Sequence, residues 1–361
     1  MSKYSLLYLD DEKDRLVLPI KEKLEDQGQL TITVDKPKSF EDEIDKLAAI
    51  LPDFSGIVLD LQLNGPQEDG SQVRYQAPSL AQQLRILASE GKAKDVPIFL
   101  CSTDDKVKAS FKRDFTSHDL FDWTFMKDEI SSATIDKICS IVEGYDQITK
   151  GTKDFSALLQ RDYNDLDQRI LSRFINEENP PVHEVARIIF KEVIQEPGLL
   201  INEEILAARL GIDKEKSKDW DKILDAFKSA GYDGIFESGW NRWWADRVAD
   251  LFESFAKENL GFLNATERVN ALKAKFNLEN IVPAKALPLS NSTNFWTICQ
   301  ATGNPIDTFE GYKIDKKKEP RPWQEYSYVS LYALMERIAE AKNIKLHPSE
   351  FERFDIESAA L

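Results

Sequence analysis

The stretch Gly56-Ile57-Val58-Leu59-Asp60-Leu61-Gln62-Leu63-Asn64-Gly65 decides the fold of this chain. Residues 56–59 form a continuous aliphatic run bounded by turn residues, which is typical of a central parallel strand buried on both faces. Asp60 follows at the point where that strand is expected to end. In an open parallel sheet, ligands bind in the crevice beyond the carboxyl ends of the strands. Asp60 is therefore a candidate for chemistry rather than a solvated charge.

Length and composition indicate a globular chain of two or three domains. The chain has 361 residues, of which 42% are hydrophobic and 30% charged. No apolar run approaches the ~18 residues that cross a bilayer, and the N-terminus lacks the apolar segment of a signal peptide. The cysteines Cys101, Cys139 and Cys299 lie far apart without metal-ligand spacing, which is typical of a reduced compartment. We therefore expect a cytoplasmic protein that does not enter the membrane.

The charge argues against nucleic acid as a partner. The formal net charge is −16, and residues 1–150 carry 19 Lys and Arg against 28 Asp and Glu. An acidic surface repels a phosphate backbone. The basic run at residues 313–321 is interpreted as a solvated loop.

Strand-like and helix-like segments alternate through residues 1–148. Between the strands, apolar residues recur at intervals of three or four, as in amphipathic helices. Such alternation implies βαβ units and a parallel sheet with right-handed crossovers. The prediction is an α/β domain with five parallel strands, at residues 5–9, 31–34, 56–59, 96–101 and 123–126.

Polar residues stand at the carboxyl ends of these strands. Asp10 and Asp11 follow the first strand, Asp60 the third, Ser102 the fourth and Lys127 the fifth. Clustered carboxylates repel one another, so a hard divalent cation such as Mg²⁺ is their natural companion. A Lys and a hydroxyl beside that cation suit a phosphoryl group, whose oxygens need cationic and hydrogen-bonding partners. The pattern predicts an acidic site that handles phosphate.

These segments resemble the receiver domain of two-component response regulators, which has the flavodoxin-like fold. The resemblance covers about 40% of the chain and rests on four short segments, each weak alone, in the expected order. They are Leu-Leu-Tyr-Leu-Asp10-Asp11, Ile-Val-Leu-Asp60-Leu-Gln-Leu, Pro97-Ile-Phe-Leu-Cys-Ser102 and Trp-Thr-Phe-Met-Lys127.

The resemblance implies a role for each matched residue. Asp60 would accept a phosphoryl group from a histidine kinase, while Ser102 and Lys127 would contact its oxygens. Asp10, Asp11, Asp60 and the backbone carbonyl of Gln62 would hold Mg²⁺. The resemblance implies no enzymatic activity beyond self-dephosphorylation. The charge of the phosphoryl group would change the conformation of the surface formed by the last helices and strands of the receiver domain.

Three departures from the family pattern bear on this reading. Asp128 follows Lys127 where receivers usually have Pro, and Thr124 occupies the position of the usual switch aromatic, between Trp123 and Phe125. The polar loop at residues 64–78 is longer than the family norm. The alternative is a degenerate receiver that keeps the fold and acts, for example as a homodimer, without phosphorylation.

Residues 149–361 are expected to form a mainly helical output or interaction domain. Apolar residues at helical spacing predict one amphipathic helix of some twenty residues over 155–174. Residues 202–239 resemble the start of a helix-turn-helix followed by a wing, but the charges on the exposed side of the second helix nearly cancel. Trp240, Trp243 and Trp244 are interpreted as core residues, with a partner hot spot as the alternative.

The sequence therefore predicts a phosphorylation-controlled response regulator whose helical domain binds an unidentified protein. Three other classes remain open. They are a transcription factor with a winged-helix-like output, a phosphate sink or decoy receiver that can belong to a bacterial defence system, and a phosphorylation-independent scaffold. No nucleophile elbow, phosphate-binding glycine loop or metal motif marks an enzyme in the second half.

Overall fold

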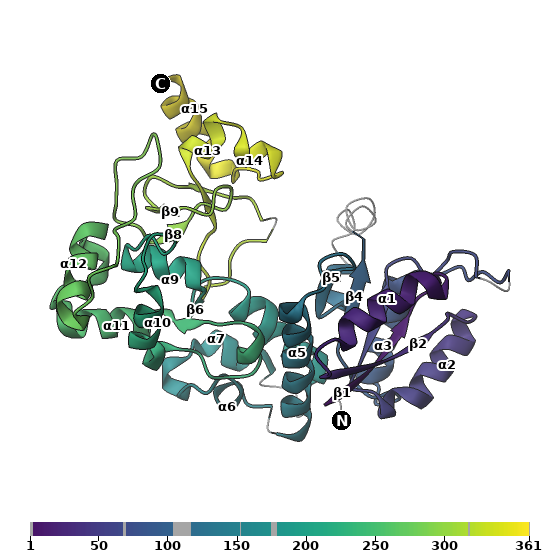
Figure 1. The fold of residues 1–361 in the computed structure, drawn as a ribbon. Helices are drawn as coiled ribbons and strands as arrows, with labels where there is room; N and C mark the ends of the chain where they lie inside the picture. Colours follow the sequence, from purple (N-terminus) through teal and green to yellow (C-terminus); the bar gives the residue numbers. More distant parts are fainter. Residues whose placement is uncertain are drawn as a thin grey trace. The chain divides into compact units, whose positions relative to one another are not determined.

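The computed structural model describes residues 3–67, 70–103, 117–151, 153–174, 179–316 and 318–360. Its N-terminal part holds a five-stranded parallel sheet in the order β2-β1-β3-β4-β5 (Figure 1). The strands are β1 Tyr4–Leu9, β2 Leu30–Asp35, β3 Gly56–Asp60, β4 Ile98–Ser102 and β5 Trp123–Met126. This strand order is that of the flavodoxin-like doubly wound fold, so the predicted fold class is confirmed.

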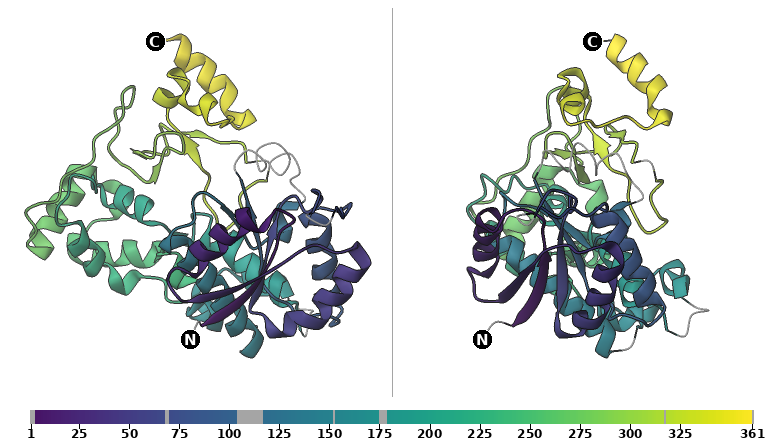
Figure 2. Two further views of the ribbon diagram at one scale, coloured as in Figure 1. Left: turned by 45° about the vertical axis from the view of Figure 1, so that its right-hand side comes forward. Right: turned by 90° about the vertical axis from the view of Figure 1, so that its right-hand side faces the viewer.

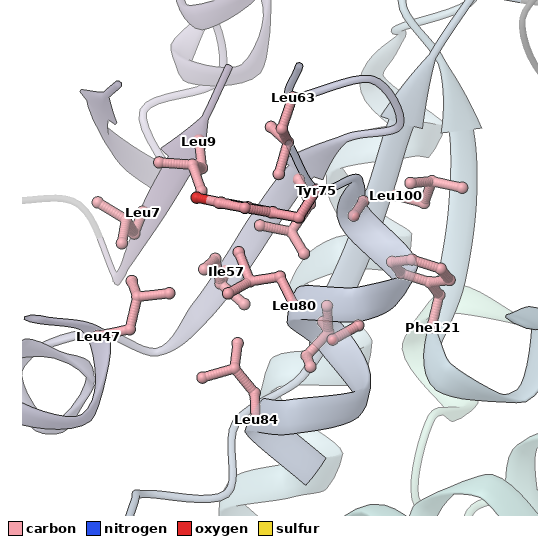
Figure 3. Packing of buried hydrophobic residues seen from close by; sticks show 14 of the residues in the cluster. Leu7, Leu9, Leu47, Ile57, Leu63, Tyr75, Leu80, Leu84, Leu100 and Phe121 are labelled. Atoms are coloured by element: carbon pink, nitrogen blue, oxygen red, sulfur yellow. The ribbon is translucent and has the colours of Figure 1, made fainter. Parts of the chain in front are cut away.

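Helices cover both faces of the sheet (Figure 2). Helices α2 Phe40–Ile50 and α3 Ala77–Ser89 lie on one face, and α1 Asp14–Glu25 and α5 Ser132–Lys150 lie on the other. Because side chains alternate along a strand, each strand supplies both cores. The α2–α3 side contains Leu7, Leu9, Ile57, Leu59, Ile98, Leu100, Leu47, Leu80 and Leu84 (Figure 3).

A buried polar network joins several elements of this part of the chain. The Arg85 guanidinium on α3 donates to Asp122 Oδ2 at 2.6 Å and lies 3.3 Å from Asp95 Oδ1. Asp122 Oδ1 accepts a hydrogen bond from Tyr145 of α5 at 2.6 Å. Asp95 Oδ2 accepts from the backbone N–H of His183, at the start of α8 Val182–Arg187, at 3.0 Å. Since the buried charges have partners of opposite sign, the network ties α3, α5 and α8 to the sheet.

The described chain divides into two compact units. The first comprises residues 1–190 and 233–240, and the second comprises residues 191–232 and 241–361. The predicted boundary at residues 148 and 149 lies inside α5, and the first unit continues beyond it.

The single long helix predicted over residues 155–174 is wrong. The segment forms two short helices, α6 Phe155–Leu159 and α7 Gln168–Leu171, with 3-10 turns after each. Gln160 has φ of 51° and ends α6 in the left-handed conformation. The carboxylates of Asp162 and Asp167 then cap separate turns, because an aspartate that bonds nearby backbone N–H groups favours helix starts over helix interiors.

The wing expected at residues 231–239 is replaced by a segment packed on α5. Throughout residues 231–239, all of which the structure describes, the only regular element is the 3-10 turn η8 Glu237–Gly239. The ring of Phe236 lies against Gly144 of α5, and Gly239 N–H donates to Ser140 Oγ at 3.0 Å. Antiparallel pairing is limited to the start of the segment, where Gly231 bridges to Trp243 and Tyr232 N–H donates to the Arg242 carbonyl at 2.9 Å. Beyond it, Phe236 and Trp240 are both buried, so the burial of these two rings replaces further pairing.

The second unit is mainly helical, as predicted for residues 149–361. Its principal helices are α9 Glu203–Leu210, α10 Trp220–Ala226, α11 Ala245–Ala256 and α12 Ala265–Phe276, which share one hydrophobic core. Trp243 and Trp244 form β7 Trp243–Trp244, paired with β6 Leu200–Ile201, and are buried. A second core lies among the short strands β8 Thr297–Ile298, β9 Pro305–Ile306, β10 Tyr312–Lys313 and β11 Tyr328–Val329 and the helices α13 Leu331–Met335, α14 Ile338–Ala341 and α15 Phe351–Ala359.

Candidate functional site

The residues predicted for the site stand at one edge of the sheet. Asp10 and Asp11 directly follow β1, Asp60 ends β3, Ser102 ends β4 and Lys127 follows β5. In register, Leu59 pairs with both Leu9 and Leu100, so the ends of β1, β3 and β4 are level. The Lys127 N–H donates to the Ser102 carbonyl at 2.9 Å and fixes the end of β5 against β4.

Lys127 links the two central carboxylates. Its Nζ lies 2.8 Å from Asp10 Oδ2 and 2.8 Å from Asp60 Oδ1, and 3.2 Å from Glu12 Oε2. Asp10 and Asp60 are fully buried, and Lys127 is nearly so. Burial alone would lower the pKa of Lys127, but the charges of Asp60 and Asp10 outweigh burial and raise that pKa well above its usual value. Lys127 is therefore a permanent cation at neutral pH.

The remaining carboxylate oxygens accept hydrogen bonds from the backbone. Asp60 Oδ2 accepts from Gln62 N–H, and Asp10 Oδ1 accepts from Glu12 N–H, each at 2.8 Å. These bonds give each side chain a backbone partner on the oxygen that does not face Lys127. They also fix the rotamers, so that Asp60 Oδ1 faces Lys127.

Tyr8 is a site residue that the sequence analysis missed. Its hydroxyl donates to Asp10 Oδ2 at 2.6 Å, and its side chain is fully buried. Burial raises the pKa of Tyr8 well above its usual value, so the phenol stays protonated and acts as a donor. The signal was present in the sequence: Tyr8 is two residues before Asp10, and residues two apart share one face of a strand.

The long loop after β3 contacts the acidic pair. Gly65 N–H donates to Asp11 Oδ2. A Cβ atom at position 65 would lie 2.6 Å from that oxygen, so a larger residue here would require the Asp11 carboxylate to turn away. Asp11 is thus directed towards the loop, whereas Asp10 and Asp60 converge on Lys127.

Ser102 has an unusual environment. Its side chain is fully buried, and its Oγ has no hydrogen-bond partner among the described residues. Most buried hydroxyls are satisfied, because an unmade hydrogen bond in the interior is costly. Ser102 ends β4, and β4 pairs with β3, the strand that ends at Asp60. A hydroxyl without a partner at this position is suited to form a hydrogen bond with a bound group.

Cys101 adjoins the site but is chemically inert there. It pairs in register with Asp60 and is fully buried. Burial raises the pKa of its thiol to about 12. Because the thiolate is the reactive form, Cys101 is a packing residue at neutral pH.

The residues fit a hard divalent cation by their chemistry. Asp10, Asp11, Glu12 and Asp60 supply carboxylate oxygens, the donors that Mg²⁺ prefers, and Lys127 neutralises only part of their charge. Within the described ranges, however, no three acidic, His or Cys side chains are already arranged as a metal site. Lys127 and Tyr8 take coordination positions on Asp10, so a cation would have to share these oxygens. The ligand roles of Asp10, Asp11, Asp60 and the Gln62 carbonyl stay predictions.

The departures from the receiver pattern are visible in β5 and after it. Asp128 is exposed in the turn that follows Lys127. The ring of Trp123 lies 5.6 Å from that of Phe125 and 6.1 Å from that of Trp240, edge to face. Lys137 of α5 lies over both the Trp123 and the Trp240 rings. The Trp123 ring of β5 is therefore packed against Trp240 and Lys137 of α5.

Comparison with known proteins gives only distant structural likenesses. No protein-family model matches the sequence, and no curated protein matches it. One solved structure comes from a family of redox sensors in the streptococci that evolved from two-component response regulators. It is 11% identical with a TM-score of 0.28, and the alignment covers 55% of this chain and 95% of that chain. The lysine decarboxylase LdcF of Francisella novicida is 14% identical with a TM-score of 0.23, covering 58% and 32% of the two chains. Neither likeness is strong enough to bear on function.

None of the helices in the described part of the chain has the length and apolar character needed to cross a membrane.

Proposed function

We propose that the N-terminal α/β part acts as a phosphoacceptor switch in which Asp60 receives a phosphoryl group from a histidine kinase. One observation carries the proposal: Lys127 Nζ lies 2.8 Å from both Asp10 and Asp60, at the end of a sheet with flavodoxin-like strand order. The Lys127 cation, held between two buried carboxylates, can neutralise part of the negative charge of a phosphoryl group that arrives at Asp60. The unpartnered hydroxyl of Ser102 adds a donor at the neighbouring strand end.

The proposed step is an in-line transfer. The carboxylate oxygen of Asp60 forms a bond to phosphorus, and the bond from phosphorus to the kinase histidine nitrogen breaks. That imidazole keeps the electron pair and takes up one proton from solvent. The product is an acyl phosphate on Asp60 and a neutral histidine. Such transfers depend on positioning and charge neutralisation more than on covalent help from the protein.

The residues at the strand ends have different roles in this transfer. Asp60 is the nucleophile, Lys127 pairs with the phosphoryl oxygens, and Ser102 donates a hydrogen bond to them. Asp10 and Asp11 would hold Mg²⁺, which when bound supplies further charge neutralisation. Tyr8 is a positioning residue, because its hydrogen bond fixes the rotamer of Asp10.

The output we propose is binding of a protein partner by the helical second unit. The acidic charge of the chain disfavours a transcription factor. A phosphate sink would be labelled at Asp60 without any change in partner binding.

A phosphorylation-independent scaffold is the second candidate. One observation favours it: both oxygens of Asp10 already accept hydrogen bonds, from Tyr8, from Lys127 and from the Glu12 N–H. A pocket neutralised by its own lysine can serve stability alone, as buried ion pairs do elsewhere.

Intact mass after incubation with acetyl phosphate and Mg²⁺ separates these candidates. The wild-type chain should gain the mass of one phosphoryl group. The gain should be absent in Asp60→Ala and when Mg²⁺ is chelated. Asp53→Ala is the matched control, because Asp53 is an exposed aspartate before β3 and its loss should leave labelling unchanged. Absence of labelling in the wild type, or equal labelling of Asp60→Ala, would exclude phosphotransfer to Asp60.

A further inference from the structure

A cavity of about 800 Å³ lies between two loops of the first unit. One wall is the segment from Asp35 to Glu41 that joins β2 to α2, and the other belongs to the long loop after β3, at Gln67 and residues 71–75. Both loops leave the carboxyl ends of parallel strands, where open α/β sheets bind ligands. The volume falls within the range of small-molecule sites, roughly 300–1,000 Å³.

The two walls of the cavity are bonded to each other. Gln67 Nε2 donates to the Pro37 carbonyl at 2.7 Å, and the Tyr75 hydroxyl donates to the Lys38 carbonyl at 3.0 Å. The Phe40 and Tyr75 rings meet edge to face at 5.3 Å. Tyr75 is anchored in the hydrophobic core beside Leu9, Leu63 and Leu80 (Figure 3). The cavity is therefore formed without a ligand, which lowers the entropy cost of binding.

Two cations at this cavity lack an ionic partner. Lys36 pairs with Asp14 at 3.4 Å, and Asp35 pairs with Lys46 at 3.1 Å. Lys38 and Arg74 are exposed and make no ion pair with any residue that the structure describes. Glu41 also lines the cavity, is exposed and makes no ion pair with a described residue, so the three unpaired side chains carry one net positive charge. In a chain with a net charge of −16, a cavity with a positive balance favours an anion.

The floor of the cavity is apolar. Val73, Tyr75 and Pro37 are buried, and Phe40 is half-buried. An inorganic anion needs neither this surface nor this volume. A flat organic body would cover the Phe40 ring, and hydrophobic walls with a few polar groups are the usual design of small-molecule pockets.

We propose that the cavity binds an organic phosphate with a planar body, of the size of a nucleoside monophosphate. Its phosphate lies between Lys38 and Arg74, and its planar part packs on Phe40. Binding here uses none of the residues assigned to phosphotransfer and does not depend on the proposed function.

Calorimetric titration with AMP tests the proposal, with adenosine and inorganic phosphate as separate probes. The full chain is used, without phosphodonor or Mg²⁺, as wild type and as Asp60→Ala, so the outcome is independent of phosphotransfer. AMP should bind both proteins saturably, and adenosine and inorganic phosphate each more weakly. Lys38→Ala combined with Arg74→Ala should weaken AMP binding by about tenfold or more, since two charge-assisted hydrogen bonds are lost.

Two matched variants complete the experiment. Lys38→Arg combined with Arg74→Lys keeps the charge and should keep AMP binding within a few-fold. Lys92→Ala combined with Lys150→Ala removes the same charge at exposed positions outside the cavity and should leave AMP binding unchanged. Absence of saturable AMP binding, adenosine binding as tight as that of AMP, or an equal loss in the Lys92 and Lys150 variant would each overturn the proposal.

Discussion

Ser102 places a buried hydroxyl without a partner at the end of β4. An unsatisfied buried polar group costs about 1–3 kcal/mol, so Ser102→Ala should raise the free energy of unfolding by about 1 kcal/mol. The same change should slow labelling of Asp60 by a phosphodonor, because one hydrogen-bond donor is lost. Urea denaturation and intact mass measure the two effects.

Ser140 is the matched control for this prediction. It is also a buried serine, but its Oγ accepts a hydrogen bond from Gly239 N–H. Ser140→Ala should therefore lower the free energy of unfolding by about 1 kcal/mol and leave labelling unchanged. A loss of stability in Ser102→Ala equal to that in Ser140→Ala would contradict the assignment.

Lys127→Met should destabilise the fold by about 3–5 kcal/mol at neutral pH, because two buried carboxylates lose their counterion. The folded-state pKa of Lys127 is raised above the unfolded value of about 10.4. A group of this kind contributes its full stability below the unfolded pKa and loses that contribution as pH rises through the folded pKa.

The stability difference between wild type and Lys127→Met should therefore be constant across pH 6–9 and shrink only at pH values above about 10.4. Denaturant midpoints measured at each pH test this. Lys150→Met, at an exposed lysine paired with Asp146, should change stability little at any pH. A difference that shrinks on going from pH 7 to pH 9 would be inconsistent with Lys127 as a permanent cation.

The sequence was sufficient to predict those site residues whose positions are determined by the ends of the strands. Asp10, Asp60 and Lys127 come together because each directly ends or follows a parallel strand, and the register makes those ends level. Tyr8 could also have been found, because it lies two residues before Asp10 and therefore on the same face of β1. Gly65 could not, because its contact with Asp11 depends on the path of a long loop, which no local pattern carries.

At the scale of the elements, Gly144 of α5 illustrates packing that overrides helix propensity. Alanine stabilises a helix interior by about 1 kcal/mol relative to glycine. A Cβ atom at position 144 would, however, overlap the ring of Phe236. Gly144→Ala should therefore lower the free energy of unfolding, by about 1–3 kcal/mol as for other overpacked positions.

A double-mutant cycle tests this explanation. In a Phe236→Ala background the ring is gone, so Gly144→Ala should become neutral or stabilising. The measurement is urea denaturation of the four proteins. If Gly144→Ala costs the same in both backgrounds, contact with Phe236 does not determine the choice of glycine.

The helices and strands were predictable where a single spacing of apolar residues continues from the start to the end of the element. β5 was predicted with its observed bounds, and the other strands differ from prediction by one or two residues at their ends. The helix predicted over residues 155–174 failed although several of its apolar residues are buried, among them Phe155, Leu159 and Ile170. Short-range capping by Asp162 and Asp167 divides the segment while the apolar spacing is unchanged.

At the scale of the whole molecule, the hydrophobic cores belong to different units. The core beneath α2 and α3 lies within residues 7–121, and the core of α9 to α12 lies within residues 201–281. Separate cores permit separate opening reactions, because local stability follows local burial. Unfolding of this chain is therefore not expected to be a single two-state transition.

Native-state hydrogen exchange of Lys127→Met tests this independence. The substitution destabilises the sheet, so amide exchange should accelerate in α1, α3 and α5 but stay at the wild-type rate in α9, α11 and α12. Leu272→Ala, at a fully buried position of α12, should give the opposite pattern, since a Leu-to-Ala cavity costs about 2–5 kcal/mol in the other core. Acceleration of all six helices by either substitution would mean that the chain opens as one cooperative body.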